Sequence, residues 1–305
     1  MNRTPDFIII GGMKCMTSTL HEQLAAQQGF CMSNPKEPFY FSDDAVYQRG
    51  PQWYASIWED PAPGDLCGES STHYSKLPTY PDTVQRMVDA VADVKLIYVM
   101  RHPIDRLVSQ YVHEWSMGLV TDPIDRAIET LPILVEYSRY AMQLQPYLNA
   151  FPRQNLLPVF FDRLRKHPQS ELERIGRFLG SDQVPIWQPE LGAQNIGAQR
   201  MRTSVWRDRI AYAPGISTLR RVCVPKSVRN RVKSFWQMQK QPTLSEESIT
   251  SLTKVFDTDL ERLSRLLDLP ETLSCATFKQ TVDWDLSTVP PAETSRCSMT
   301  SEVSE

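Results

Sequence analysis

The 305-residue sequence contains no run of eighteen apolar residues, so no membrane-spanning helix is expected. Its first apolar run, residues 7–10, is too short for the core of a signal peptide. The six cysteines are scattered and lack the paired spacing of a zinc site. We therefore expect reduced thiols, no disulfide framework, no bound metal and a cytoplasmic protein.

The sequence also has little net charge. The value of −3 at pH 7 argues against a general nucleic-acid-binding protein, so no nucleic-acid partner is expected. The shares of hydrophobic residues (41%) and charged residues (23%) are typical of a soluble globular chain. Oligomeric state does not follow from any of these numbers.

A glycine pair, Gly11 and Gly12, directly follows the apolar run at 7–10. A polar turn comes next, and residues 20–26 then have the pattern of a helix. Strand, glycine-bearing turn and helix form the arrangement in which backbone N–H groups and a helix N-terminus bind phosphate. The alternative is an ordinary turn with a solvated lysine. The side chains that could add charge or hydrogen bonds are Lys14, Thr17, Ser18 and Thr19.

The turn lacks the spacing of a Walker A loop, in which a hydroxyl residue directly follows the lysine and binds magnesium. Here Lys14 is followed by Cys15 and Met16, and the hydroxyl residues come later. This spacing suits a monophosphate-sized oxyanion and counts against a kinase or GTPase.

A second candidate segment spans residues 34–44. Two prolines bracket Lys36 and Glu37, and aromatic residues follow. A carboxylate in this setting is expected to be partly desolvated, which suits a general base. The alternative is a loop glutamate paired with Lys36.

Residues 95–100 form a continuous apolar run, typical of a buried parallel strand, that ends at Arg101. Ligands of open α/β sheets bind at the carboxyl ends of strands, and a Walker B strand would end in aspartate. Residues 104–115 form a helix that carries Ser109, so Arg101 and Ser109 could bind one phosphate. We expect Arg106 to pair with Asp105 or Glu114 on the surface.

The remaining pattern alternates between helix and strand and predicts an α/β fold with a central, mainly parallel sheet. We expect one domain over residues 1–285, with a core at about 5–180 and a helical, basic C-terminal part at about 190–285. Residues 286–305 are expected to form a disordered tail. Further helices are expected at 49–60, 79–94, 137–151, 169–179 and 244–269, and a further strand at 156–161. Residues 66–78 are expected to begin with a short strand that leads into a polar loop containing Glu69 to His73.

Together the two phosphate-binding elements resemble the sulfotransferases that use 3′-phosphoadenosine 5′-phosphosulfate (PAPS). The first element runs from Lys14 through Thr17 to Leu20, and the second contains Arg101, Pro103, Arg106 and Ser109. The resemblance implies a P-loop-like three-layer α/β/α fold. It also implies that the first element binds the 5′-phosphosulfate, with Cys15 and Met16 donating backbone N–H groups, and that Arg101 and Ser109 bind the 3′-phosphate.

Within this family the sequence is most similar to the heparan-sulfate-type and bacterial branch. The segment 36–41 resembles the branch's catalytic-glutamate segment, with Glu37 as the base. Residues 109–113 resemble a pattern in which a histidine, here His113, assists catalysis. Two features depart from the family: Cys15 and Met16 follow the lysine where the family's loop usually carries glycine, and Ser70 after Glu69 replaces a second lysine.

The resemblance implies sulfuryl transfer from PAPS to a hydroxyl or amine of a carbohydrate or small-metabolite acceptor, with adenosine 3′,5′-bisphosphate (PAP) as product. Lys14 would stabilise charge on the leaving phosphate. Two alternatives stay open: a catalytically inactive nucleotide-binding protein, and a magnesium-dependent nucleotide kinase. The sequence does not identify the acceptor or the role of the arginine-rich residues 200–233.

Overall fold

The centre of the structure, a computed structural model that describes residues 3–193 and 242–284, is a five-stranded parallel sheet. The strands follow the order β2-β3-β1-β4-β5, and each neighbouring pair is parallel. This arrangement confirms the predicted α/β fold. The strands are β1 (Phe7–Gly11), β2 (Phe30–Met32), β3 (Leu66–Ser70), β4 (Lys95–Met100) and β5 (Leu156–Phe160).

The apolar sequences of the central strands reflect burial on both faces of the sheet. In β1, Ile8 packs into one hydrophobic cluster, whereas Phe7 and Ile9 pack into the cluster on the opposite face. Successive side chains of a strand point to opposite faces, so a strand covered on both sides reads as a continuous apolar run. Such a sheet needs a layer of helices on each face.

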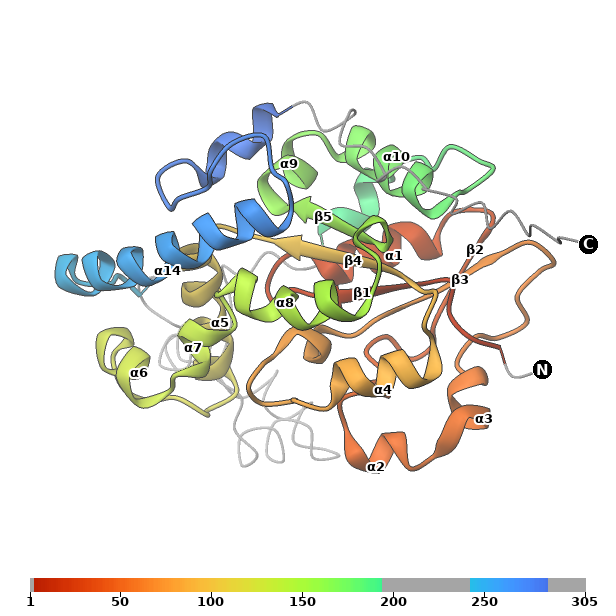
Figure 1. Ribbon diagram of the computed structural model, residues 1–305, viewed down its shortest axis with the longest axis horizontal. Helices are drawn as coiled ribbons and strands as arrows, with labels where there is room; N and C mark the ends of the chain where they lie inside the picture. The colour runs from red at the N-terminus through yellow and green to blue at the C-terminus, as the bar shows by residue number, and fades with distance from the viewer. Residues whose placement is uncertain (1–2, 194–241, 285–305) are drawn as a thin grey trace, which may run out of the picture.

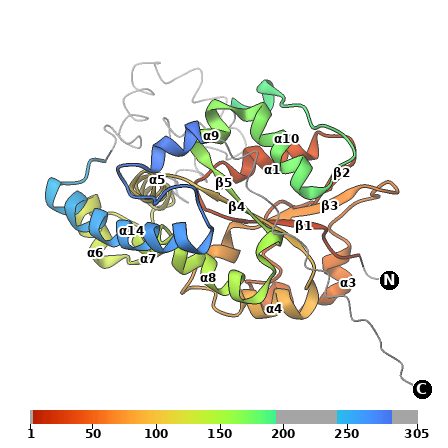
Figure 2. The ribbon, with the colours of Figure 1, turned by 45° about the horizontal axis from the view of Figure 1, so that its top comes forward.

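Two layers of helices cover the sheet (Figures 1 and 2). One face packs against α1 (Thr17–Ala25), α9 (Phe161–Lys166) and α10 (Pro168–Leu179). The other packs against α4 (Thr83–Ala90), α8 (Tyr140–Ala150) and α14 (Glu246–Leu266). These are the three layers that the resemblance to sulfotransferases implies.

The helix α14 belongs to the same folded unit although 48 residues outside the described ranges precede its segment in the chain. It lies beside α8, and the Asp259 carboxylate accepts hydrogen bonds from the N–H groups of Ala141 (2.8 Å) and Met142 (3.2 Å). A carboxylate at the first turn of a helix satisfies otherwise unpaired N–H groups. The contact therefore fixes α14 against the sheet-covering layer.

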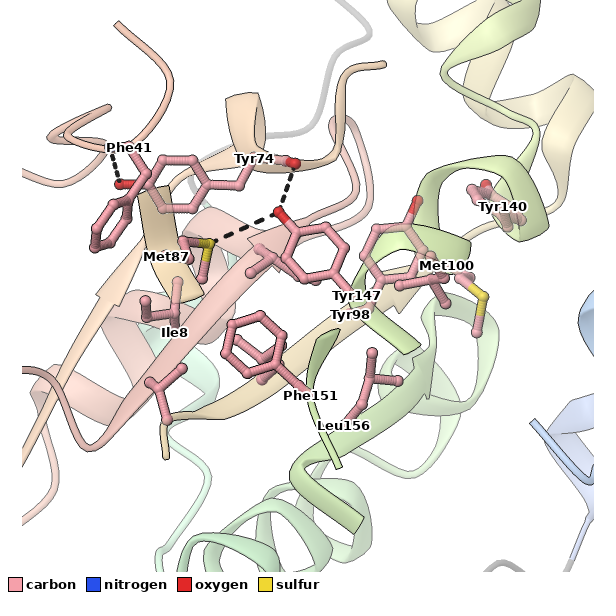
Figure 3. Close-up of a cluster of buried hydrophobic side chains, with 14 of the residues drawn as sticks. Ile8, Phe41, Tyr74, Met87, Tyr98, Met100, Tyr140, Tyr147, Phe151 and Leu156 are labelled. Carbon is pink, nitrogen blue, oxygen red and sulfur yellow. Dashed lines mark hydrogen bonds between the residues drawn. The ribbon is translucent and has the colours of Figure 1, made fainter. Parts of the chain in front are cut away.

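Figure 3 shows how a tyrosine network ties α8 to the turn after β3. The Tyr147 hydroxyl donates to the carbonyl oxygen of Tyr74 at 2.7 Å and lies 3.8 Å from the sulfur of Met87. Tyr74 belongs to the short 3₁₀ helix η1 (Thr72–Ser75). The turn that follows β3 is thereby fixed to α8, one of the helices that cover this face of the sheet.

A third hydrophobic cluster joins α14 to the helices after β4, around Leu107, Leu134 and Phe256. These helices are α5 (Pro103–Ser116), α6 (Ile124–Thr130) and α7 (Ile133–Glu136). The short helices α2 (Asp44–Tyr47) and α3 (Gly50–Ala55) follow β2, and further 3₁₀ turns are η2 (Arg153–Asn155), η3 (Pro189–Ala193) and η5 (Phe278–Asp283).

Most of the predicted elements are present, with shorter ends. The helix expected at 79–94 begins only at Thr83, after Pro81, and the helix expected at 49–60 is reduced to α3. Ser245 caps α14, accepting a hydrogen bond from the N–H of Ser248 at 3.2 Å. The arginine-rich residues 200–233 and the tail expected at 286–305 lie outside the described residues.

The strand order reverses between β1 and β4. The chain leaves β1 toward β2 on one side of the sheet and leaves β4 toward β5 on the other. The helix after β1 covers one face, and α8, between β4 and β5, covers the opposite face. In open α/β sheets, ligands bind at the carboxyl ends of strands where this reversal occurs. No helix in the described ranges is long and apolar enough to cross a membrane.

Candidate active site

The loop between β1 and α1 leaves backbone N–H groups open at the carboxyl end of β1. Met16 is the N-cap residue of α1, with φ of 69°, and provides no side-chain cap. Within the described residues, the N–H groups of Thr17, Ser18 and Thr19 make no hydrogen bond. Such uncapped first-turn donors, together with the helix dipole, form a site for an anionic oxygen.

Gly11 is needed for the close approach of the loop to the turn after β3. A Cβ atom on Gly11 would lie 1.9 Å from the Ser75 hydroxyl oxygen, and the φ of Gly11 is 149°. The Ser75 hydroxyl donates to the carbonyl oxygen of Ile10 at 2.8 Å. The end of β1 and the turn at residues 72–75 are therefore in direct contact.

Cys15 and Met16, which follow Lys14 in the loop, direct their side chains into the core. Cys15 is fully buried, and Met16 packs against the same cluster beneath α1. Burial raises the pKa of the Cys15 thiol to about 11, although Arg106 and Arg101 oppose the shift. Cys15 is therefore a neutral core residue that offers no thiolate, and its N–H already donates to the carbonyl oxygen of Gly12 at 3.2 Å.

Arg101 comes from the neighbouring strand and meets this loop. Its Nη1 donates to the carbonyl oxygen of Lys14 at 3.4 Å, and its guanidinium lies 4.7 Å from the centre of the Phe161 ring. The Nε atom of Arg101 is buried and has no hydrogen-bond partner among the described residues. A buried donor without a partner carries a desolvation cost that an anionic ligand would remove.

The other predicted residues of this element lie on α5, which begins directly after β4. Ser109 lies two turns into the helix, and its hydroxyl makes no hydrogen bond to a described residue. His113 lies one turn further along, in the last turn. The joint phosphate contact of Arg101 and Ser109, and the role of His113, stay predictions.

The expectation for Arg106 is wrong: its side chain is fully buried and pairs with neither Asp105 nor Glu114. It donates to the hydroxyl of Ser138 (2.5 Å), to Oε1 of Gln110 (2.9 Å) and to the carbonyl oxygen of Leu134 (2.7 Å). The helical spacing of Arg106 and Gln110 places both on the inner face of α5. The buried side chain of Arg106 therefore connects α5 to α7 in the interior of the protein.

Glu37 lies at the carboxyl end of β3, held by both its backbone and its side chain. Its N–H donates to the carbonyl oxygen of Ser70 at 3.0 Å, and the Thr72 hydroxyl donates to its Oε2 at 3.1 Å. Lys36 Nζ lies 2.6 Å from its Oε1, so the ion pair that the sequence left as an alternative is present. A quarter of the Glu37 side chain remains exposed, so this carboxylate is open to an incoming group.

A second carboxylate, Glu69, precedes Ser70 at the end of β3 and is fully buried. Its Oε1 accepts from the hydroxyls of Tyr54 (2.7 Å) and Tyr74 (3.0 Å), and its Oε2 from that of Ser71 (3.4 Å). Burial raises the pKa of Glu69 to about 7, although the three donors act in the opposite direction. Glu69 fixes the turn that carries Thr72, below the exposed carboxylate of Glu37.

Two neutral histidines, His21 and His73, lie near the carboxyl end of β3. The Nδ1 atom of His21, on α1, lies 2.7 Å from the Ser70 hydroxyl oxygen, and burial lowers the pKa of His21 to about 4. His73 is stacked between the rings of Phe39 and Tyr80, and burial lowers its pKa to about 4 as well. Neither adds positive charge at neutral pH, and the cation in contact with Glu37 is the ammonium of Lys36.

The sequence analysis did not single out Lys76, a partly buried lysine that directly follows η1. Burial lowers its pKa to about 8, while the carboxylates of Glu37 and Glu114 act against this shift and Arg106 acts with it. The signal in the sequence is its position two residues after Tyr74, within a polar turn at a strand end. In the described ranges, no group of three or more side chains is placed to hold a metal ion.

Comparisons with known proteins show the family to which most of this chain is similar. Residues 4–191 match the family model of the sulfotransferase domain. The chain is 31% identical over 193 residues to heparan sulfate glucosamine 3-O-sulfotransferase 6 of Homo sapiens, a match covering 60% of this chain and 54% of the relative. It is 27% identical over 204 residues to the human bifunctional heparan sulfate N-deacetylase/N-sulfotransferase 2, covering 59% of this chain and 22% of that relative.

A solved structure shares the fold over most of the chain. The sulfotransferase from Alicyclobacillus acidocaldarius has a TM-score of 0.60 at 23% identity, and the match covers 87% of this chain and 96% of that one. The chain spans about half the length of the first curated relative and about a fifth of the second. Because the family model matches more than half of the chain, the chain belongs to the sulfotransferase domain family.

Proposed function

We propose that this protein transfers the sulfuryl group of PAPS to a hydroxyl or amine of a carbohydrate or small-metabolite acceptor. The observation that carries the proposal is the contact between Arg101 and the Lys14 loop. It brings two anion-binding elements together at the carboxyl ends of β1 and β4, as a donor with separated phosphate groups requires.

The residues present fit such a donor. The loop from Lys14 to Thr19 would hold the 5′-phosphosulfate through its open N–H groups and hydroxyls. Cys15 and Met16 could contribute backbone N–H groups alone, and that of Cys15 would first have to leave the carbonyl oxygen of Gly12. Arg101, with its unpartnered buried Nε, and Ser109 would hold the 3′-phosphate. When bound, PAPS supplies the activated sulfuryl group.

Glu37 is proposed as the general base that takes the proton of the acceptor. Its carboxylate is partly exposed, and the Thr72 hydroxyl at 3.1 Å fixes its orientation. The ammonium of Lys36 is its counter-charge at 2.6 Å. A base held in one orientation within reach of the acceptor accelerates proton transfer in the transition state.

Lys14 is proposed to stabilise the negative charge that develops on the leaving phosphate oxygen. The N–H groups at the start of α1 have no side-chain cap and are fixed by the helix, so they could donate to the same oxygen without rearrangement. His113, in the last turn of α5, is proposed to position the acceptor or to assist proton transfer.

The acceptor class is a proposal based on the relatives. Those described above are named for heparan sulfate, so a glucosamine-containing glycan is the first acceptor class to test. The connection at 121–134, which forms α6 and the start of α7, packs against α5 and is proposed to contribute to acceptor specificity. The cytoplasmic location stays a prediction, to be checked by cell fractionation.

The proposal is tested by incubating the protein with PAPS and a panel of unsulfated heparan oligosaccharides, amino sugars and small phenols. We expect PAP formation that depends on one acceptor class, without added magnesium. PAP binding with no transfer to any acceptor would favour the inactive nucleotide-binding protein. Magnesium-dependent consumption of ATP would favour the kinase.

A further inference from the structure

The segment that carries the proposed base has an unusual backbone conformation. Glu37 and Phe39 both have positive φ angles, of 59° and 57°. Residues with a side chain rarely adopt this left-handed conformation, which is unfavourable and persists only where the surrounding contacts enforce it. The contacts that hold these two residues therefore also determine where the Glu37 carboxylate lies.

Two hydroxyl groups from the turn after β3 bind the backbone of this segment. The N–H of Phe39 donates to the Ser71 hydroxyl oxygen at 3.2 Å. The N–H of Phe41 donates to the hydroxyl oxygen of Tyr74 at 3.4 Å (Figure 3). Ser71 and Tyr74 are both buried, so water does not compete for these hydrogen bonds. The segment is thus fastened to the turn at two points beyond Glu37.

Glu69 is the acceptor on which both hydroxyl groups depend. A hydroxyl group that accepts a backbone N–H still has one proton of its own to donate. Ser71 donates this proton to Oε2 of Glu69 at 3.4 Å, and Tyr74 donates to Oε1 at 3.0 Å. The carboxyl group is fully buried, and the hydroxyl of Tyr54 also donates to Oε1, at 2.7 Å. One buried carboxyl group therefore orients the two hydroxyls that hold the segment.

We propose that Glu69 is a positioning residue: through two hydroxyl groups, it fixes the segment that orients the Glu37 carboxylate. The inference rests on the proposed function, in which Glu37 takes the acceptor proton. Glu37 itself contacts the same part of the chain twice, because its N–H donates to the carbonyl oxygen of Ser70 and its Oε2 accepts from the Thr72 hydroxyl. The end of β3, the turn after it and the segment at 37–41 form one hydrogen-bonded unit around Glu69.

This unit should affect the chemical step and not the binding of the donor. The groups proposed to bind the donor belong to the loop after β1 and to Arg101 and Ser109, and none of them is one of the two hydroxyls. Glu69 exchanges no proton with the substrates. It acts by keeping Glu37 at one place, and a small displacement of a catalytic group slows a reaction strongly.

The first test removes one hydroxyl of the unit. Ser71→Ala should lower kcat about 10- to 100-fold and leave the affinity for PAP unchanged. The matched control is Ser264→Ala on α14, since the Ser264 hydroxyl is also buried and also accepts a backbone N–H, that of Leu273, at 2.8 Å. The control should lose stability as Ser71→Ala does, but keep the wild-type kcat.

A double-mutant cycle separates positioning of the base from general loosening of the fold. In the Glu37→Gln background there is no base to position, so Ser71→Ala should cause little further loss of kcat. An unchanged kcat of Ser71→Ala, or an equal loss of kcat in both backgrounds, would overturn the inference.

Two substitutions of Glu69 test the carboxyl group itself. Glu69→Gln keeps an acceptor oxygen for Tyr74 and an amide group for Ser71, so it should retain most of the activity. Glu69→Leu should lose at least as much kcat as Ser71→Ala, and full activity of this variant would overturn the inference. Where melting shows that Glu69→Leu is unfolded, Ser71→Ala decides alone.

Hydrogen exchange tests the positioning independently of any reaction. Mass spectrometry of peptides covering residues 36–42 should show faster amide exchange in Ser71→Ala than in the wild type, and no change in Ser264→Ala. Unchanged exchange would overturn the inference. If the wild type forms PAP with no acceptor, the proposed function fails together with the catalytic part of the inference. Faster exchange in Ser71→Ala would then still show that the unit holds the segment.

Discussion

The guanidinium of Arg101 donates a hydrogen bond to the backbone carbonyl oxygen of Lys14 at 3.4 Å, across 87 positions of the sequence. The contact joins the carboxyl end of β4 to the loop after β1. Its consequence is that a strand-end arginine lies against the loop that precedes a helix N-terminus, where we propose that the phosphate groups of the donor bind. The account of this protein depends on that contact.

Glu37→Gln should lower kcat about 10²- to 10⁴-fold and leave the affinity for PAP unchanged. The amide has nearly the shape of the carboxylate, and Thr72 can still contact it, but it cannot accept the acceptor proton. Steady-state kinetics with the acceptor found in the panel, combined with PAP titration, measure both effects. A fully active Glu37→Gln protein would exclude this residue as the base.

Arg106→Ala should reduce the free energy of unfolding by about 3 kcal/mol or more. The substitution leaves the side chains of Gln110 and Ser138 and the carbonyl of Leu134 without their buried donor, and it creates a cavity between α5 and α7. Urea unfolding followed by circular dichroism measures the change.

Arg126→Ala is the matched control for this experiment, since Arg126 is exposed on the neighbouring helix α6. Its effect on the free energy of unfolding should stay within about 0.5 kcal/mol. Equal effects of the two substitutions would show that the buried network around Arg106 contributes little to stability.

Glu69→Gln should become more stable relative to the wild type as the pH rises from about 4.5 to about 7. In this window the folded wild type keeps Glu69 protonated, whereas the unfolded chain has lost that proton. The folded state therefore binds more protons, and the wild type loses stability as the pH rises, by about 3 kcal/mol in total. Above this window the difference is constant.

Urea unfolding of both proteins at about pH 5 and about pH 8 measures this relative change. Comparing the variant with the wild type cancels the contribution of His21, whose lowered pKa acts in the opposite direction between about 4 and 6.5. A difference in stability that does not change with pH would show that Glu69 is ionised in the folded protein throughout the range.

The sequence was sufficient for the features that depend on local order. The loop after β1 and the strand ending at Arg101 each read as a strand-to-helix junction, and Ser245 marked the start of α14 by its capping pattern. These signals arise from neighbouring residues, so they can be recognised without knowledge of the tertiary structure. The three-residue strand β2 gave too short a pattern to be recognised.

The sequence was not sufficient where distant segments determine the environment of a side chain. Arg106 is buried because Ser138 and Leu134, about 30 positions away, supply its acceptors. The placement of Glu37 depends on Thr72, 35 positions later. The sequence likewise left open what replaces the lysine missing at Ser70.

The most direct measurement is calorimetric titration of the wild type and Arg101→Ala with PAP, 5′-AMP and ATP in the absence of magnesium. The account predicts that the wild type binds PAP more tightly than the other two nucleotides, because Arg101 recognises the 3′-phosphate. It also predicts that Arg101→Ala loses this preference. Equal binding of all three nucleotides by the wild type, or preference for ATP, would contradict the sulfotransferase account.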